Sequence, residues 1–242
     1  MRVRPVLRMC ARCVTRQATG RRPGWGCGPV IHLAVVSAKR VRKTPEERIG
    51  EIERAAIKLI AERGYNGISL KDVADEVGMS QPGLLHYVGT KEGLLSLLIT
   101  DVYDGSGTPA DFMGSGLPGS DPDALSFPAY LRFLVRHNAA QRQMVQLFLM
   151  LYIESVNPSH PLHEYYRNRP ENIWEHYSRY PWRIPTEVGP WDPNMRPYLR
   201  RVIEAMDGVQ MRWLCVPPVD LYDEWLAFER MIFPSPLWDG YR

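Results

Sequence analysis

The chain has 242 residues, of which 45% are hydrophobic and 24% charged, and this excludes a low-complexity or fibrous protein. The longest strongly apolar stretch, 145–153, is about half of the ~20 residues that a membrane span needs, so the sequence predicts no transmembrane helix. Four cysteines are too few for a disulfide framework in a chain of this length. Their number favours a reducing compartment, and we expect a cytoplasmic protein.

Positive charge is concentrated in residues 1–43. They carry eleven Lys and Arg and no Asp or Glu, whereas the rest of the chain carries nineteen basic against twenty-seven acidic residues. Such a block is typical of a solvated, flexible tail, with contact to nucleic acid as the functional alternative. We interpret 1–43 as a disordered arm. A second interpretation stays open, in which translation starts near Val36 and residues 1–35 are not native.

Two sets of residues have the composition of a metal site, but neither has convincing spacing. One set lies in the arm and lacks a clean second pair; the other is three histidines that could share a helical face. We expect no metal site and no cofactor at either set, which are Cys10, Cys13, Cys27 and His32, and His160, His163 and His176.

Strong helical signals begin at Thr44-Pro45-Glu46-Glu47, a capping box with proline at the first helical position. Apolar residues at helical spacing follow up to Gly64, which ends this helix. Three more helices are predicted, each opened by a hydroxyl side chain that can cap it: a short one after Ser69, a third over 81–87 after Ser80, and a fourth over 91–103 after Thr90.

The second and third of these helices are joined only by Gly78-Met79-Ser80, and this is the spacing of a helix-turn-helix. Val73, Ala74, Val77 and Leu84 would pack the pair against the first helix, and Gly78 would supply the positive φ of the sharp turn. The N-terminal residues of the third helix would then face base edges in a DNA major groove. The alternative is a three-helix bundle with no role in DNA binding.

Sequence motifs across 46–104 support the first interpretation. Ala55, Ala56 and Leu59 in the first helix, 73–80 (VADEVGMS) and 86–95 (HYVGTKEGLL) together resemble the TetR family of transcriptional regulators. The family usually has Tyr where this chain has Leu85, which puts Leu85 in doubt as a phosphate contact. The family often has Phe where this chain has Val88, and this difference only makes a core side chain smaller.

The resemblance implies roles for individual residues of the helix-turn-helix. Gln81 can hydrogen-bond adenine, and Gly83 would let the backbone approach the groove closely. Lys71 could reach a phosphate or a guanine, and polar residues at the helix ends would hold phosphates. The implied DNA-binding set is Ser69, Lys71, Ser80, Gln81, Pro82, Gly83, His86, Tyr87, Thr90 and Lys91.

Charge in this segment is unfavourable for DNA binding. Residues 44–104 contain six basic and eleven acidic residues. The cluster Lys39, Arg40, Arg42 and Lys43 immediately upstream would supply the missing positive charge by lying along phosphates or in the minor groove.

The remaining chain also reads as helical. We expect a long flexible loop over 105–122, a Trp- and Pro-rich connection over 181–193, no strand, and helices over 124–138, 140–156, 161–180, 194–215 and 219–233. The fold class is therefore all-α. Its predicted parts are the arm 1–43, a helix-turn-helix domain 44–104 and a helical effector-binding and dimerisation domain 105–242.

The last two helices resemble the dimerising end of many TetR-family members, and each carries an apolar stripe. The resemblance implies a homodimer that pairs through Leu199, Ile203, Met206, Gln210, Trp213, Leu221, Trp225, Phe228 and Ile232. It also implies a cavity for a small hydrophobic or aromatic effector, lined by Phe133, His137, Phe148, Met150, Tyr152, Trp174 and Tyr177.

These observations predict a repressor that binds a palindromic operator as a homodimer and is released by its effector. A DNA-binding regulator without a small ligand is the main alternative. A helical enzyme is a remote one, because the sequence has no phosphate loop, no nucleophile elbow and no paired carboxylates in a recognisable frame.

Overall fold

The computed structural model describes residues 43–242. The expectations for a disordered arm, for a start near Val36 and for zinc at Cys10, Cys13, Cys27 and His32 therefore fall outside the described residues. Within 43–242 we refer to residues 43–104 as the N-terminal bundle and to residues 105–242 as the C-terminal bundle. No helix of the described residues is long and apolar enough to cross a membrane.

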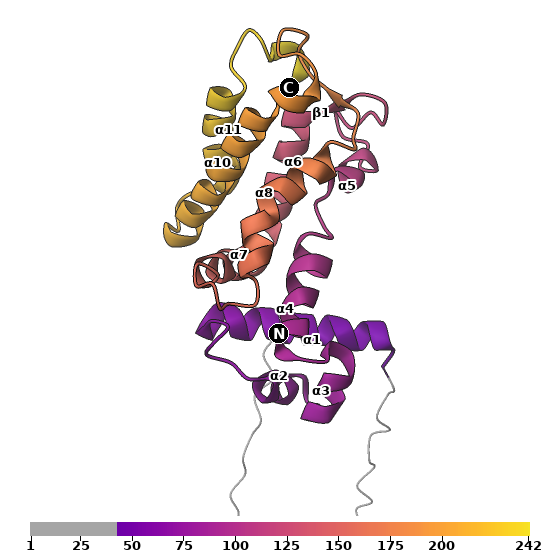
Figure 1. Ribbon diagram of the computed structural model, residues 1–242, viewed down its shortest axis with the longest axis vertical. Coiled ribbons are helices and arrows are strands. Elements are labelled where there is room, and N and C mark those ends of the chain that lie inside the picture. The colour runs from indigo at the N-terminus through magenta and orange to yellow at the C-terminus, as the bar shows by residue number, and fades with distance from the viewer. Residues whose placement is uncertain (1–42) are drawn as a thin grey trace, which may run out of the picture. The chain divides into compact units, whose positions relative to one another are not determined.

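The N-terminal bundle contains α1 (Pro45–Arg63), α2 (Leu70–Val77) and α3 (Gln81–Val88), which are grouped together in Figure 1. The predicted caps are confirmed. Thr44 and Glu47 form a reciprocal capping box on α1, and Ser69 and Asp72 form one on α2. Gly78 ends α2 in the left-handed conformation with φ 72°, which leaves the chain free to turn directly into α3.

A fourth helical segment leaves this bundle. It begins as α4 (Lys91–Ser96) and continues without a break as a π-helical segment, η1 (Leu97–Tyr103). In η1 the Asp104 N–H donates to the carbonyl of Ile99, five residues back, at 2.9 Å. The predicted helix 91–103 is thus confirmed in extent, but its second half is wound more widely than an α-helix.

The predicted loop 105–122 is partly wrong, because it contains a short helix, α5 (Pro109–Met113). Thr108 and Asp111 form a capping box on it, and proline occupies its first turn. Phe112 from this helix is 1% exposed and contacts the ring of Phe133. Burial of this one side chain therefore anchors a segment whose glycines and prolines had indicated only a loop.

The C-terminal bundle is mostly helical, as predicted, with boundaries shifted by a few residues. Its longer helices are α6 (Phe127–Ala140), α7 (Arg142–Glu154), α8 (His163–Tyr177), α10 (Arg196–Cys215) and α11 (Leu221–Ile232), and α9 (Trp191–Asn194) and η2 (Asp239–Tyr241) are single turns. The expectation of no strand is wrong by one small element. β1 (Leu125–Ser126) pairs in parallel with β2 (Trp182–Arg183).

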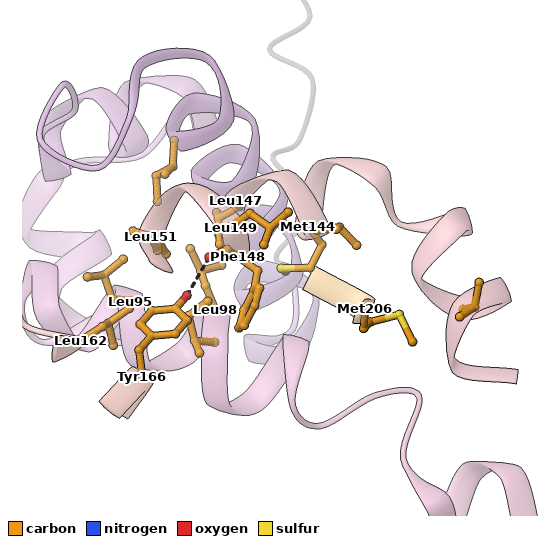
Figure 2. Close-up of a cluster of buried hydrophobic side chains, with 14 of the residues drawn as sticks. Leu95, Leu98, Met144, Leu147, Phe148, Leu149, Leu151, Leu162, Tyr166 and Met206 are labelled. Carbon is orange, nitrogen blue, oxygen red and sulfur yellow. Dashed lines mark hydrogen bonds between the residues drawn. The ribbon is translucent and has the colours of Figure 1, made fainter. Parts of the chain in front are cut away.

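A continuous core joins the two bundles. Figure 2 shows Leu95 and Leu98 of the α4–η1 segment among the side chains of α7, with Tyr166 of α8 beside them. The Tyr166 hydroxyl donates to the carbonyl of Phe148 at 2.8 Å, which satisfies the polar end of a buried ring. The α4–η1 segment is therefore packed against the C-terminal bundle as well as connected to it by the chain.

Candidate functional site

The start of α3 is on the surface of the N-terminal bundle. Gln81 and Pro82 are exposed, and the backbone N–H of Gly83 donates to the Ser80 hydroxyl at 3.2 Å. Leu84 on the opposite side of α3 is fully buried, so the helix is fixed through one face and presents the other. This is the geometry that a recognition helix needs, because a base-reading side chain must project while its backbone is held.

Lys91 has a different environment from the one expected. Its ammonium donates to the carbonyls of Tyr65 at 2.8 Å and Ile68 at 2.6 Å, and it lies 4.1 Å from the centre of the Tyr65 ring. Burial lowers the pKa of this amine. Lys91 therefore ties the start of α4 to the connection between α1 and α2, and a phosphate contact by Lys91 stays a prediction.

Several other basic side chains of the N-terminal bundle are paired with carboxylates. Lys71 lies 2.6 Å from Asp75, and Lys58 lies 2.7 Å from Glu76. Both pairs are exposed, and such pairs contribute little to stability and exchange readily for other partners. A phosphate could replace either carboxylate, but the pairs also show that positive charge is scarce on this bundle.

The C-terminal bundle contains a cavity of about 310 Å³. It lies between the end of η1, the start of α5, α6, α8 and α10. Four tyrosines form much of its wall, and a guanidinium, two carboxyl groups and an imidazole lie in or beside it. The residues that carry these groups are Tyr103, Tyr130, Tyr165, Tyr177, Arg169, Asp104, Asp207 and His176.

Of the seven residues expected to line a cavity, only Tyr177 does so. Phe148 lies beneath the cavity wall, stacked on Tyr103 with ring centres 4.2 Å apart. The other five pack elsewhere. Tyr152 stacks on Tyr166 with ring centres 4.8 Å apart, and Trp174 stacks on Trp191 with ring centres 5.3 Å apart. The ring centres of Phe133 and His137 lie 6.4 Å apart, and the sulfur of Met150 lies 3.9 Å from the side-chain nitrogen of Gln146. Large aromatic side chains are also typical of a hydrophobic core, and these residues pack in the core instead of lining the cavity.

The cavity-lining residues that the sequence did not predict follow a helical pattern on α8. Tyr165, Arg169, Asn172 and His176 recur every three or four residues and all line the cavity. Arginine, asparagine and histidine on one face with tyrosines form a mixed polar face, which a search for apolar stripes does not detect. The histidines considered for metal binding do not cluster either, and the described residues hold no group of three or more metal-ligand side chains.

Comparison with known proteins identifies the N-terminal bundle. Residues 52–98 match the family described as bacterial regulatory proteins, tetR family. This segment of the chain is therefore a TetR-type DNA-binding region. No curated protein matches it at a significant level.

Solved structures of similar fold agree with a TetR-family architecture. GusR of Salmonella enterica is 18% identical, with a TM-score of 0.57 over 78% of this chain and 95% of its own. A transcriptional regulator of Rhodococcus sp. is 18% identical, with a TM-score of 0.56 over 76% and 95%. The fatty acid degradation regulator FadR of Bacillus halodurans is 18% identical, with a TM-score of 0.52 over 81% and 98%. At this identity they establish the fold.

The apolar stripes expected to form a TetR-type dimer face are mostly buried within the protomer. Seven of the nine side chains are no more than 9% exposed: Leu199, Met206, Gln210, Trp213, Leu221, Trp225 and Ile232. Within the protomer α10 and α11 pack on each other and on α6, α7 and α8. Pairing of these side chains with a second copy stays a prediction. Ile203 is half-buried, and Phe228 is 38% exposed.

Proposed function

We propose that this protein is a cytoplasmic, ligand-responsive repressor of the TetR family that binds a palindromic operator as a homodimer. The observation that carries the proposal is the position of the cavity at one end of the α4–η1 segment. Tyr103 and Asp104 at that end line the cavity, while Lys91 at the other end holds the connection between α1 and α2. A ligand in the cavity would therefore act on a helix whose far end positions the helix-turn-helix.

The DNA-binding part of the proposal rests on α3. Gln81 is exposed at its first position, and a glutamine amide can form paired hydrogen bonds with adenine N6 and N7. Ser80 and Thr90 cap their helices through the side-chain oxygen, and their hydroxyls would donate to phosphates. The Ser69 hydroxyl donates to Asp72 at 2.5 Å and would have to turn to reach a phosphate. Lys71, Pro82, Gly83, His86 and Tyr87 complete the proposed contact surface.

Symmetric DNA binding needs a dimer, and the exposed face of α10 and α11 offers a surface for it. Met211 is 45% exposed, Phe228 38% and Met231 76%, and all three are large apolar side chains on neighbouring helices. Exposed apolar side chains that share one face are typical of protein interfaces. We infer that this outer face, opposite to the buried stripes, pairs with a second copy so that two α3 helices can enter successive major grooves.

The experiment that tests DNA binding is footprinting on the DNA upstream of the protein's own gene, followed by affinity measurements with Gln81→Ala. The loss of paired hydrogen bonds should weaken binding by about 1–3 kcal/mol, and only for sequences with the preferred base at one position per half-site. Glu92→Gln, an exposed residue of α4, is the control for a change that leaves α3 intact. Equal losses on all sequences would mean that Gln81 does not read bases, and absence of any footprint would contradict the proposed function.

A further inference from the structure

One charged side chain at the cavity wall has a buried hydrogen-bond donor without a partner among the described residues. Arg169, from α8, lies with its guanidinium carbon 4.7 Å from the centre of the Phe148 ring. Its Nε atom is buried and has no hydrogen-bond partner among the described residues. Asp104 and Asp207 act on its charge through Coulomb attraction. A cation is thus held against an aromatic face at the cavity wall, with this buried hydrogen-bond donor unused.

This arrangement is costly in the absence of an acceptor. A guanidinium has five N–H donors and stays charged at any physiological pH, and burying one of these donors without an acceptor is unfavourable. Nearly all buried polar groups in proteins therefore have a partner. Because the described protein supplies none at Arg169, and because the neighbouring space is a cavity, the natural source of an acceptor is a molecule that enters the cavity.

The two nearby carboxyl groups do not supply the missing partner. Asp104 accepts a hydrogen bond from the Tyr165 hydroxyl at 2.6 Å, and Asp207 lies beside the cavity on α10. Each of them interacts with Arg169 by Coulomb attraction and not by a hydrogen bond. Burial raises the pKa of both carboxyl groups, with the charge of Arg169 acting in the opposite direction. The two carboxyl groups act on Arg169 through Coulomb attraction, and they leave its buried Nε–H without an acceptor.

The rest of the wall indicates what else the ligand must contain. Tyr103, Tyr130, Ile173 and Met206 present rings and aliphatic surface to the space. A volume of about 310 Å³ is at the lower end of the range for small-molecule sites, which suits a ligand of modest size. Resting on the ligand-responsive function proposed above, we propose that the effector is a small organic acid. Its carboxylate forms paired hydrogen bonds with Arg169, and its apolar body packs against the tyrosine walls.

The test uses sets of ligands that differ only in the polar group. Indole-3-acetate, indole-3-acetamide and tryptamine form one set, and octanoate, octanamide and octylamine form another. Thermal unfolding of the full chain is measured with each compound, followed by calorimetry for any that raises Tm. At least one acid should raise Tm, whereas its amide and amine should not. Arg169→Met should weaken binding of that acid roughly 10- to 100-fold, because a charged hydrogen-bonded pair is lost.

Arg167→Met is the matched control, because Arg167 is two residues away on α8 and pairs with Glu164 at the surface. It should bind the acid as the unmodified protein does. If Arg169→Met fails to fold, Arg169→Lys keeps the charge but loses the planar fork, and affinity should fall to an intermediate value. The inference is overturned if no acid raises Tm, if an amide or amine binds better, or if neither Arg169 variant weakens binding.

These outcomes separate the inference from the function on which it rests. An amide or amine that binds and releases operator DNA would contradict the acidic effector and leave a ligand-responsive regulator. An acid that binds through Arg169 without changing operator affinity would support the inference about the site and contradict the proposed switch.

Discussion

The two bundles satisfy their polar groups in different ways. In the N-terminal bundle Thr44, Ser69, Ser80 and Thr90 each cap a helix, and the charged side chains of α1 and α2 form surface ion pairs. In the C-terminal bundle α5, α6 and α11 are capped by a side chain, but α7, α8 and α10 begin without one. Every buried side-chain polar atom without a partner in the described chain lies at residue 154 or beyond, Arg169 and Gln210 among them.

This difference agrees with the roles proposed for the two bundles, which are DNA binding for the N-terminal one and ligand binding for the C-terminal one. A DNA-reading helix must keep a fixed shape and present polar groups outward, and local caps achieve this without help from distant residues. A ligand cavity must keep polar groups inward and incompletely satisfied until the ligand arrives. The N-terminal bundle therefore depends on local sequence, and the C-terminal bundle depends on contacts between helices far apart in the chain.

The largest predicted effect tests whether the buried stripe of α11 is core or interface. Trp225→Ala should lower the free energy of unfolding by about 3–5 kcal/mol at every protein concentration, because the side chain is 0% exposed within one protomer. Phe228→Ala, on the exposed side of the same helix, should leave protomer stability nearly unchanged and weaken dimerisation. Urea unfolding and sedimentation velocity measure the two effects. A loss of stability for Trp225→Ala that depends on protein concentration would instead place Trp225 in the dimer interface.

The second prediction compares two lysines of the N-terminal bundle. Lys91→Met should destabilise the protein by about 1.5–3 kcal/mol, because two backbone carbonyls lose a charged donor. Lys71→Met removes only an exposed pair with Asp75 and should leave stability unchanged while reducing the salt dependence of DNA binding. Thermal unfolding and operator titrations at several salt concentrations separate the two roles. A stable Lys91→Met protein with a reduced salt slope would make Lys91 a phosphate contact.

The smallest effect is a pH dependence that arises where the bundles meet. His160 packs edge-on against Tyr65 with ring centres 5.5 Å apart, and burial lowers the pKa of its imidazole below 6.5. The unfolded chain therefore binds a proton more readily than the folded one, so stability is full above pH 6.5 and falls as the pH drops towards the folded pKa. His137 and His176 act in the same direction, and Asp104 and Asp207 in the opposite one.

His160→Phe isolates this contribution because it keeps a ring against Tyr65 without a titrating group. Urea unfolding at pH 7.5, 6.5 and 5.5 should show a shallower loss of stability for the variant than for the unmodified protein. Identical slopes would mean that His160 does not titrate differently in the two states.

Sequence reasoning located the helices of the N-terminal bundle well because their signals are local. A hydroxyl residue followed by an acidic one, or a glycine at a turn, specifies a helix end through hydrogen bonds within four residues. The same signal was present at Thr108, Pro109 and Asp111 and could have predicted α5. The two-residue strands have no such signal, because a pair that short shows no periodicity.

The faces of the C-terminal helices could not be assigned in this way. A helical stripe shows that one side of α10 or α11 is buried, but it does not show whether the partner is the same chain or another copy. The cavity was missed for a related reason. Arg169 and Asp104 come from α8 and the end of η1, and only the folded arrangement brings them to one space. The sequence likewise does not predict the hydrogen bonds of Lys91, because the carbonyls that accept them lie more than twenty residues earlier in the chain.

The coupling between the cavity and α3 is tested most directly by calorimetry of the acid that raises Tm most, with and without saturating operator DNA. Linkage requires that the operator weaken acid binding by the same factor as the acid weakens operator binding. We predict a lower affinity for the acid in the presence of operator, matched by a loss of operator affinity in the reverse titration. Equal acid affinities with and without operator would contradict a ligand-controlled repressor.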